Sequence, residues 1–161
     1  MIAYEKVSLD TALRQMLDEA VDAVSAAEGS ILLFSDDGGS LRFVLSHSPV
    51  AQKLEGLQQP LSHGITGLAV SLQQPMIVNE TCQNAMFDPT VDLKTGMTTR
   101  TIMIVPLVTP KVEFGALTAI NSRRAEGFGL EDLHHYSVFA EQICRRLTDL
   151  ELGMEDVGAL G

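Results

Sequence analysis

The sequence predicts a single α+β domain, in which a mostly antiparallel β-sheet is flanked by a helix near each end of the chain. Apolar residues recur every three and four positions near both ends, as they do on the buried face of a helix. Between these segments, two pairs of apolar runs are each joined by turn-forming residues, which is typical of β-hairpins. The length of 161 residues suits one core. We expect one domain over residues 1–161, with its core at about 8–152 and a frayed tail at 153–161.

A helix and a hairpin are expected first. From Ser8 to Glu28 the apolar side chains are three and four residues apart, which predicts an amphipathic helix with Ser8 as its cap. The apolar run 30–34 and the alternating run 41–47 lie on either side of the turn cluster 36–39. This arrangement predicts the first β-hairpin.

The middle of the chain contains the segment most suited to a functional role. A short helical pattern at 65–74 is stopped by Pro75, and residues 76–78 form a short apolar run typical of a strand. The segment 79–100 is dense in Asn, Asp, Thr and Gly, and it is longer than most connections inside a compact domain. We therefore expect a functional loop at 79–100.

The last elements are a second hairpin and a long helix. Residues 101–108 and 112–121 are apolar runs joined through the turn at 109–111, and Gly115 indicates a point of close backbone approach. Residues 130–152 follow a helical pattern.

This last helix carries a stripe of apolar side chains separated by three and four residues. The stripe consists of Leu133, Tyr136, Ala140, Ile143, Leu147 and Leu150. A repeat of this kind is typical of a coiled-coil seam. We therefore predict a homodimer held together by the terminal helices through this stripe.

The composition excludes several classes of protein. Eleven Lys and Arg against 21 Asp and Glu give a net charge of −10, which disfavours binding to nucleic acids and to anionic membranes. No apolar run reaches the roughly 18 residues of a membrane-spanning helix. Because the first residues do not resemble an export signal, we expect a cytoplasmic protein. With only Cys82 and Cys144, neither a disulfide framework nor structural zinc is expected.

Several motifs occur at the starts of the predicted elements. They are Gly29-Ser30-Ile31-Leu32, Gly64-Ile65-Thr66-Gly67 and Pro75-Met76-Ile77-Val78-Asn79. Together with the order of the elements, they resemble the GAF domain, a ligand-sensing module of signalling proteins, over residues 11–150. The segment 87–102 is similar to the long loop and following strand of cyclic-nucleotide-binding GAF domains in phosphodiesterases. The resemblance implies a PAS-related sheet of about six strands, with the N- and C-terminal helices packed on one face and a ligand pocket under the long loop on the other.

The cyclic-nucleotide branch of this family has a spaced signature that the chain matches in part. Asn121, Phe128 and Asp132 match it in order and spacing. Ser122 stands where that branch has a Lys, and an uncharged Ser122 cannot pair with Asp132 as the Lys does. Thr118 stands where nucleotide-binding relatives tend to have Glu or Gln and is too short to contact a base. The resemblance therefore implies a small ligand of unknown identity, and a cyclic nucleotide is disfavoured.

The resemblance and the strand pattern also yield candidate ligand-binding residues. They are Ser30, Phe43, His47, Thr66, Asp92, Thr95, Thr99 and Thr118. Thr95 and Thr99 are four residues apart, so a helical loop segment would present both hydroxyls on one face. His47 is expected on the same strand face as Phe43, where its imidazole could contact an anionic ligand or sense pH. The alternative for each residue is a purely structural role.

The preferred hypothesis is a regulatory domain that binds a small molecule, performs no catalysis and requires no cofactor. An output domain or partner protein would receive the signal. A second hypothesis is a ligand-free dimerisation or interaction module. A third is an enzyme that reduces free methionine sulfoxide, but such enzymes use several loop cysteines and the loop here has only Cys82. No metal site is expected, because His134 and His135 are adjacent and lie on different faces of a helix.

Overall fold

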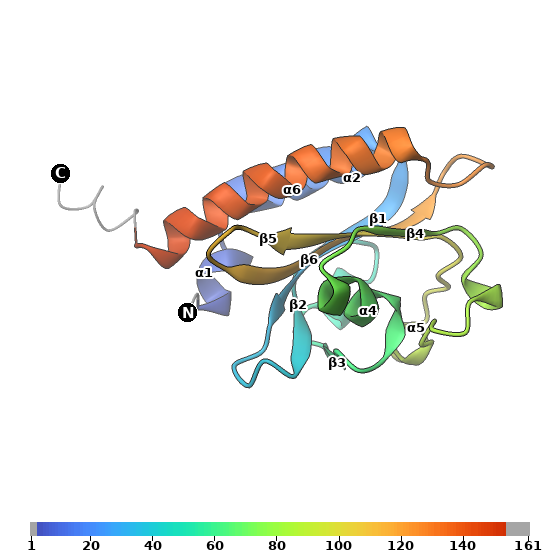
Figure 1. The fold of residues 1–161 in the computed structure, drawn as a ribbon, viewed down its shortest axis with the longest axis horizontal. Coiled ribbons are helices and arrows are strands. Elements are labelled where there is room, and N and C mark those ends of the chain that lie inside the picture. The colour runs from blue at the N-terminus through green and yellow to red at the C-terminus, as the bar shows by residue number, and fades with distance from the viewer. Residues whose placement is uncertain (1–2, 154–161) are drawn as a thin grey trace.

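A computed structural model describes residues 3–153 and contains one six-stranded antiparallel sheet with helices on both faces (Figure 1). The strands are β1 (Ala26–Phe34), β2 (Ser40–His47), β3 (Gln58–Pro60), β4 (Met76–Val78), β5 (Ile102–Val108) and β6 (Glu113–Ser122). Their order across the sheet is β3-β2-β1-β6-β5-β4. The two predicted hairpins are therefore joined through the β1–β6 pair, which aligns Ser30 with Thr118. The predicted α+β fold class is confirmed.

The helices divide into two groups that cover opposite faces of the sheet. The helices are α1 (Tyr4–Ser8), α2 (Thr11–Ala23), α3 (Ala51–Leu54), α4 (Gly64–Leu72), α5 (Thr90–Thr95) and α6 (Leu130–Glu151), and η1 (Thr81–Gln83) is a short 3-10 helix. In Figure 1, α2 and α6 lie side by side along one face, while α4 and α5 lie beyond the other. Each face has its own apolar core. No helix within residues 3–153 has the length and hydropathy needed to cross a membrane.

The first predicted helix is divided into three elements. Ser8 belongs to α1, and its hydroxyl donates to the Glu5 carbonyl instead of capping the next helix. Asp10 caps α2, since its carboxylate accepts from the Leu13 N–H at 2.9 Å. The helix ends at Ala23, and the chain then enters β1, where pairing with β6 outweighs the weak helical pattern of residues 26–28.

Gly115 occupies the close approach that the sequence predicts. A Cβ atom at this position would lie 1.9 Å from the Leu32 carbonyl oxygen on the neighbouring strand. The backbone φ of Gly115 is +154°, which side chains other than hydrogen rarely allow. The pairing of β6 with β1 therefore depends on glycine here.

The stripe predicted to form a dimer seam is buried within the chain. Five of its members, Tyr136, Ala140, Ile143, Leu147 and Leu150, are at most 5% exposed, and Leu133 packs beside them. They fill the space between α6, α2 and the sheet, because α6 lies lengthwise over the sheet beside α2 (Figure 1). An ion pair between Arg146 and Asp10 holds the two helices together at 2.6 Å. The prediction of this seam is wrong: the repeat of threes and fours belongs to an intramolecular core.

Some short elements were not predicted. Helix α3 and strand β3 lie in a polar segment that contains few apolar residues, and α5 lies inside the long loop. The predicted frayed tail at 153–161 lies, apart from Gly153, outside the described residues.

Candidate functional site

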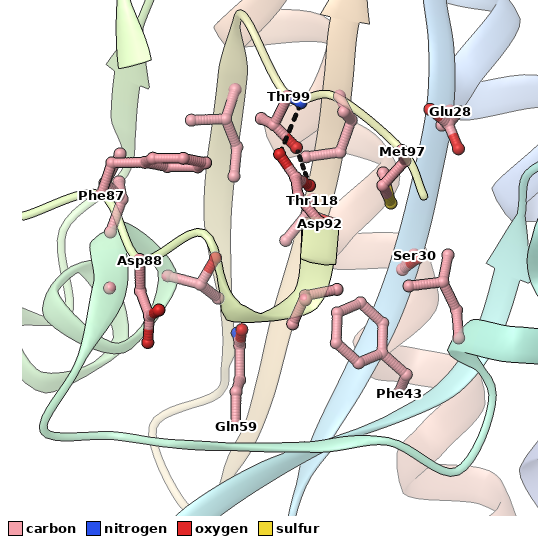
Figure 2. Close-up of a pocket in the computed structure, with 17 residues that line it drawn as sticks. Glu28, Ser30, Phe43, Gln59, Phe87, Asp88, Asp92, Met97, Thr99 and Thr118 are labelled. Carbon is pink, nitrogen blue, oxygen red and sulfur yellow. Dashed lines mark hydrogen bonds between the residues drawn. The ribbon is translucent and has the colours of Figure 1, made fainter. Parts of the chain in front are cut away.

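A cavity of about 70 Å³ lies between the sheet and the loop at 79–100 (Figure 2). Six of the residues predicted for ligand binding line it: Ser30, Phe43, Thr66, Asp92, Thr99 and Thr118. They come from β1, β2, α4, the loop and β6, so distant parts of the chain meet here. The cavity adjoins an outer groove of about 780 Å³, and the two share Gln59 and Phe87 among their walls.

The loop wall of the cavity is held by one carboxylate. Asp92, in α5, accepts hydrogen bonds from the Thr99 N–H at 2.7 Å and from the Thr99 hydroxyl at 2.8 Å. Figure 2 shows both bonds as dashed lines. They close the turn that follows α5, where Gly96 has a φ of +78°. Asp92 therefore both lines the cavity and fixes the loop over it.

Both ends of the loop are tied by asparagine side chains to the segment that leads into α6. At the start of the loop, the Asn79 amide donates to the Phe128 carbonyl at 3.0 Å and accepts from the Phe128 N–H at 2.9 Å. At its end, the Asn121 side chain accepts from the Arg100 and Thr101 N–H groups and donates to the Thr98 carbonyl. Two of the three matched signature residues, Asn121 and Phe128, therefore take part in anchoring the loop.

The third signature residue, Asp132, caps α6 and forms an ion pair. Its carboxylate accepts from the Gly129 N–H at 2.9 Å and also contacts the Arg124 guanidinium. Burial would raise the pKa of Asp132, but the bonds from Arg124 and Gly129 outweigh it and hold the pKa below its ordinary value. Ser122 does not supply this partner, as expected. Arg124, two residues later, does so, and nothing in its sequence position predicts this role.

A second link joins the cavity wall to α6. The Tyr136 hydroxyl, on the buried face of α6, donates to the Thr118 carbonyl at 2.6 Å, and burial raises the pKa of Tyr136 above its ordinary range. Gly29 allows this approach, since a Cβ atom there would lie 2.9 Å from the Tyr136 hydroxyl oxygen.

Thr95 does not line the cavity, contrary to expectation. Helix α5 ends at Thr95 itself, so Thr95 and Thr99 do not share a helical face. The Thr95 hydroxyl instead donates to the Val91 carbonyl at 2.9 Å within the helix.

His47 also lies away from the cavity because a β-bulge interrupts the expected alternation. Strand β1 pairs Ile31 with Leu45 but Leu32 with Phe43, which leaves one extra residue in β2 between them. Phe43 therefore faces the cavity, whereas Leu45 joins the core under the terminal helices. His47 follows Leu45 and forms a 2.8 Å contact with Asp18 of α2, with its side chain 42% exposed.

Several lining residues were not predicted. Glu28 was expected in a helix but lies in β1, two residues before Ser30. Side chains two residues apart in a strand lie on the same face, so a strand extended back from Ser30 would have placed Glu28 and Ser30 on one face. Phe87, Asp88 and Met97 come from the loop, where no periodic pattern could identify them.

Neither cysteine lines the cavity. Cys82 is exposed in η1, and Cys144 is buried in α6, where burial raises the pKa of its thiol to about 11. Among residues 3–153, no group of three or more His, Cys, Asp or Glu is arranged to hold a metal ion.

A family model of the GAF domain matches residues 6–147. The chain belongs to the GAF domain family. This GAF domain is 23% identical over 148 residues to a probable 3′,5′-cyclic phosphodiesterase of Caenorhabditis elegans, a match that covers 86% of the chain and 20% of the worm protein. It is 29% identical over 80 residues to the α′ subunit of a mouse cone cGMP-specific phosphodiesterase, covering 50% of the chain and 9% of that subunit. The chain thus spans a fifth or less of these curated relatives.

Solved structures show the same fold. The second GAF domain of DevS from Mycobacterium smegmatis is 19% identical with a TM-score of 0.69, and the match covers 92% of this chain and 97% of that domain. A type II free methionine-R-sulfoxide reductase from Thermoplasma acidophilum is 12% identical with a TM-score of 0.71, covering 89% and 94%. At these identities the likeness concerns the fold alone.

Proposed function

We propose that this GAF domain is the regulatory part of a signalling protein. The domain binds a small ligand in the cavity, and binding changes the position of α6 without catalysis. The relatives support a signalling role, since two of them are phosphodiesterases. The cavity supports ligand binding, because its walls combine apolar surface with a few polar groups from separate elements.

The observation that carries this proposal is the pair of asparagine tethers. Asn79 and Asn121 tie the two ends of the loop over the cavity to the segment 121–128, which leads into α6. A ligand that moves the loop must therefore also pull on the start of α6, unless the tethers break. The Tyr136 bond to Thr118 supplies a second route from the cavity wall to the same helix. Such a contiguous set of contacts can carry a coupling between two sites.

The absence of catalysis is supported by the positions of the thiols. A sulfoxide reductase of the cysteine type needs a reactive thiol at its substrate, and the cavity-lining residues in the described part of the chain include no cysteine. Turnover of free methionine sulfoxide with a thiol reductant, lost in Cys82→Ser, would contradict this part of the proposal.

The ligand-free interaction module loses its principal support, because the apolar stripe of α6 is occupied within the chain. Homodimerisation stays a proposal, and a dimer that keeps this core intact must use other side chains. Light scattering at high micromolar concentration tests it. We expect the oligomeric state to be insensitive to substitutions in the buried stripe that preserve folding, such as Leu147→Met.

Native mass spectrometry of the freshly purified chain tests the binding proposal. We expect a non-covalent small-molecule adduct on the wild type. Thr118→Met fills the cavity from β6 and should abolish the adduct, whereas Thr148→Met, on α6 and away from the cavity, should keep it. An adduct that persists in Thr118→Met would place the ligand elsewhere. A wild type without any adduct would favour the ligand-free module.

A further inference from the structure

We propose that the ligand of this cavity is a small molecule that carries a protonated amine. The inference rests on the proposed function, since it names the class of ligand for the same cavity. Three kinds of group in the walls support it: carboxylates, free hydroxyls and aromatic rings.

All the charged side chains that line the cavity are acidic. Glu28 from β1 and Asp88 and Asp92 from the loop line the cavity, and none of its lining residues within the described chain is Lys, Arg or His. His63 and Lys94 line the outer groove instead. A phosphate or carboxylate inside the cavity would therefore meet three carboxylates and no cationic side chain, and only the backbone N–H groups at the start of α4 would favour it, whereas an ammonium would be attracted by the carboxylates.

Two buried hydroxyls are also available in the cavity. Thr66 and Thr118 are 7% and 3% exposed, and both line it. Neither side-chain hydroxyl makes a hydrogen bond to another residue within 3–153. Every fully enclosed side-chain nitrogen or oxygen in that range has a partner. The two hydroxyl oxygens must therefore border open space, and the cavity is the space that both residues line. They are ready to accept from the N–H groups of a bound amine.

The remaining walls suit the same ligand. Asp92 receives one hydrogen bond on each carboxylate oxygen from Thr99, so its orientation is set before a ligand arrives, and each oxygen keeps a further acceptor site. The Phe43 and Phe87 side chains line the cavity from the sheet and the loop (Figure 2). Aromatic faces attract organic cations more than they attract neutral groups of the same size.

A titration with three probes of matched size tests this inference. We would add n-butylammonium, n-butanol or n-butanoate at constant ionic strength and follow the methyl NMR signals of Ile65 and Ile102, which line the cavity. Ile143, in the core under α6, is the control signal. We expect n-butylammonium to bind about tenfold more tightly than n-butanol, and n-butanoate to bind most weakly.

Three variants assign the preference to the cavity. Glu28→Gln and Asp92→Asn should each bring the affinity for n-butylammonium close to that for n-butanol. Asp22→Asn removes an exposed carboxylate from α2, on the opposite face of the sheet, and should leave the preference unchanged. If Asp92→Asn loosens the loop, Glu28→Gln still provides the test, because Glu28 lies in β1 and a Gln side chain can still accept from the Ser48 hydroxyl, as Glu28 does.

The outcomes separate this inference from the proposed function. Equal affinity for the three probes at the cavity methyls would overturn the amine preference and leave the cavity as a binding site. If none of the probes shifts those methyls, the cavity does not bind small molecules of this size, and both proposals fail.

Discussion

Asn121 shows how one side chain can determine the geometry of a loop more than twenty residues away in sequence. Its backbone φ is +61°, a left-handed conformation that Asn and Gly tolerate best. This conformation turns the side chain toward the end of the long loop, where it bonds three backbone groups of Thr98, Arg100 and Thr101. A residue that matches a family signature thus has a clear structural task in this chain.

Replacing Asn121 separates its backbone role from its side-chain role. Asn121→Gly keeps the left-handed backbone but loses three hydrogen bonds, which should lower the free energy of unfolding by about 1–2 kcal/mol. Asn121→Ala loses the same bonds and also strains the backbone, which should cost about 1 kcal/mol more. Urea denaturation measures both values. Equal stability of the two variants would show that the backbone conformation carries no cost.

The ion pair between Asp10 and Arg146 predicts a pH dependence of stability. Hydrogen bonds from Arg146 hold the pKa of Asp10 below its ordinary value, although burial opposes them. A carboxyl whose pKa is lowered by folding stabilises the fold above its unfolded pKa of about 4, and this stability is lost as the pH falls through the folded pKa.

Asp10→Asn should therefore make stability fall less steeply below about pH 4 than in the wild type, and Arg146→Met should have the same effect. Urea denaturation between neutral pH and about pH 2 measures the slopes. If the free energy of unfolding falls as steeply below about pH 4 in both variants as in the wild type, the Asp10–Arg146 ion pair is not the source of the pH dependence.

The cavity wall also predicts what this GAF domain does not bind tightly. Cyclic GMP carries a phosphate, and the cavity offers it three carboxylates and no cation among its lining residues in the described range. Thr118 is also too short to contact the base. We expect calorimetry to give a dissociation constant well above about 1 μM, or no heat. Nanomolar binding would show that the loop opens enough to remove these carboxylates from the ligand.

Two of the residues predicted for ligand binding line the cavity from strands that pair with each other without a bulge. Ser30 and Thr118 lie opposite each other in β1 and β6 and both line the cavity. The prediction for His47 was wrong because the bulge in β2 has no sequence signal of its own. The prediction for Thr95 was wrong because Gly96 ends α5 one residue later.

Helix α6 was correctly predicted as a helix, but the elements that its apolar stripe packs against were not predicted. A stripe of threes and fours shows that one face is buried and does not show what covers it. In this chain the cover is α2 and the sheet. The first helix was overextended for a related reason: residues 26–28 fit a weak helical pattern, and only their pairing with β6, which is distant in sequence, makes them a strand.

A charge-insertion experiment on α6 distinguishes an internal core from a dimer seam. Leu147→Glu with Leu150→Glu places two carboxylates in the core beneath α6, which should cost about 5 kcal/mol or more and abolish cooperative unfolding.

Leu130→Glu with Leu152→Glu changes two residues of the same segment that are 81% and 70% exposed, and each substitution should cost less than about 0.5 kcal/mol. Circular dichroism with urea measures both. A wild type that is a dimer, together with a Leu147/Leu150 variant that is a stably folded monomer, would support the dimer seam instead of the internal core.

The fold places the cavity and a long helix on opposite faces of one sheet and connects them through the segments that follow β4 and β6. The loop over the cavity is tied at both ends to the segment before α6, and Arg124 and Asp132 fix the first turn of that helix. The general arrangement followed from the family resemblance. The tethers did not, because Asn79 and Phe128 are 49 residues apart and only the folded chain brings them together.

Hydrogen exchange measured by mass spectrometry on an Asp92→Ala variant tests this coupling without requiring a ligand. The substitution removes both bonds to Thr99, so exchange in the segment 92–101 should accelerate about tenfold. The matched control is Asp37→Ala, because Asp37 accepts two similar bonds from Ser35 and Gly39 in the turn between β1 and β2. We expect Asp92→Ala also to accelerate exchange at 124–135, a segment to which Asp92 makes no hydrogen bond, and we expect Asp37→Ala to leave exchange there unchanged. Faster exchange confined to 92–101 would contradict the coupling between the cavity and α6.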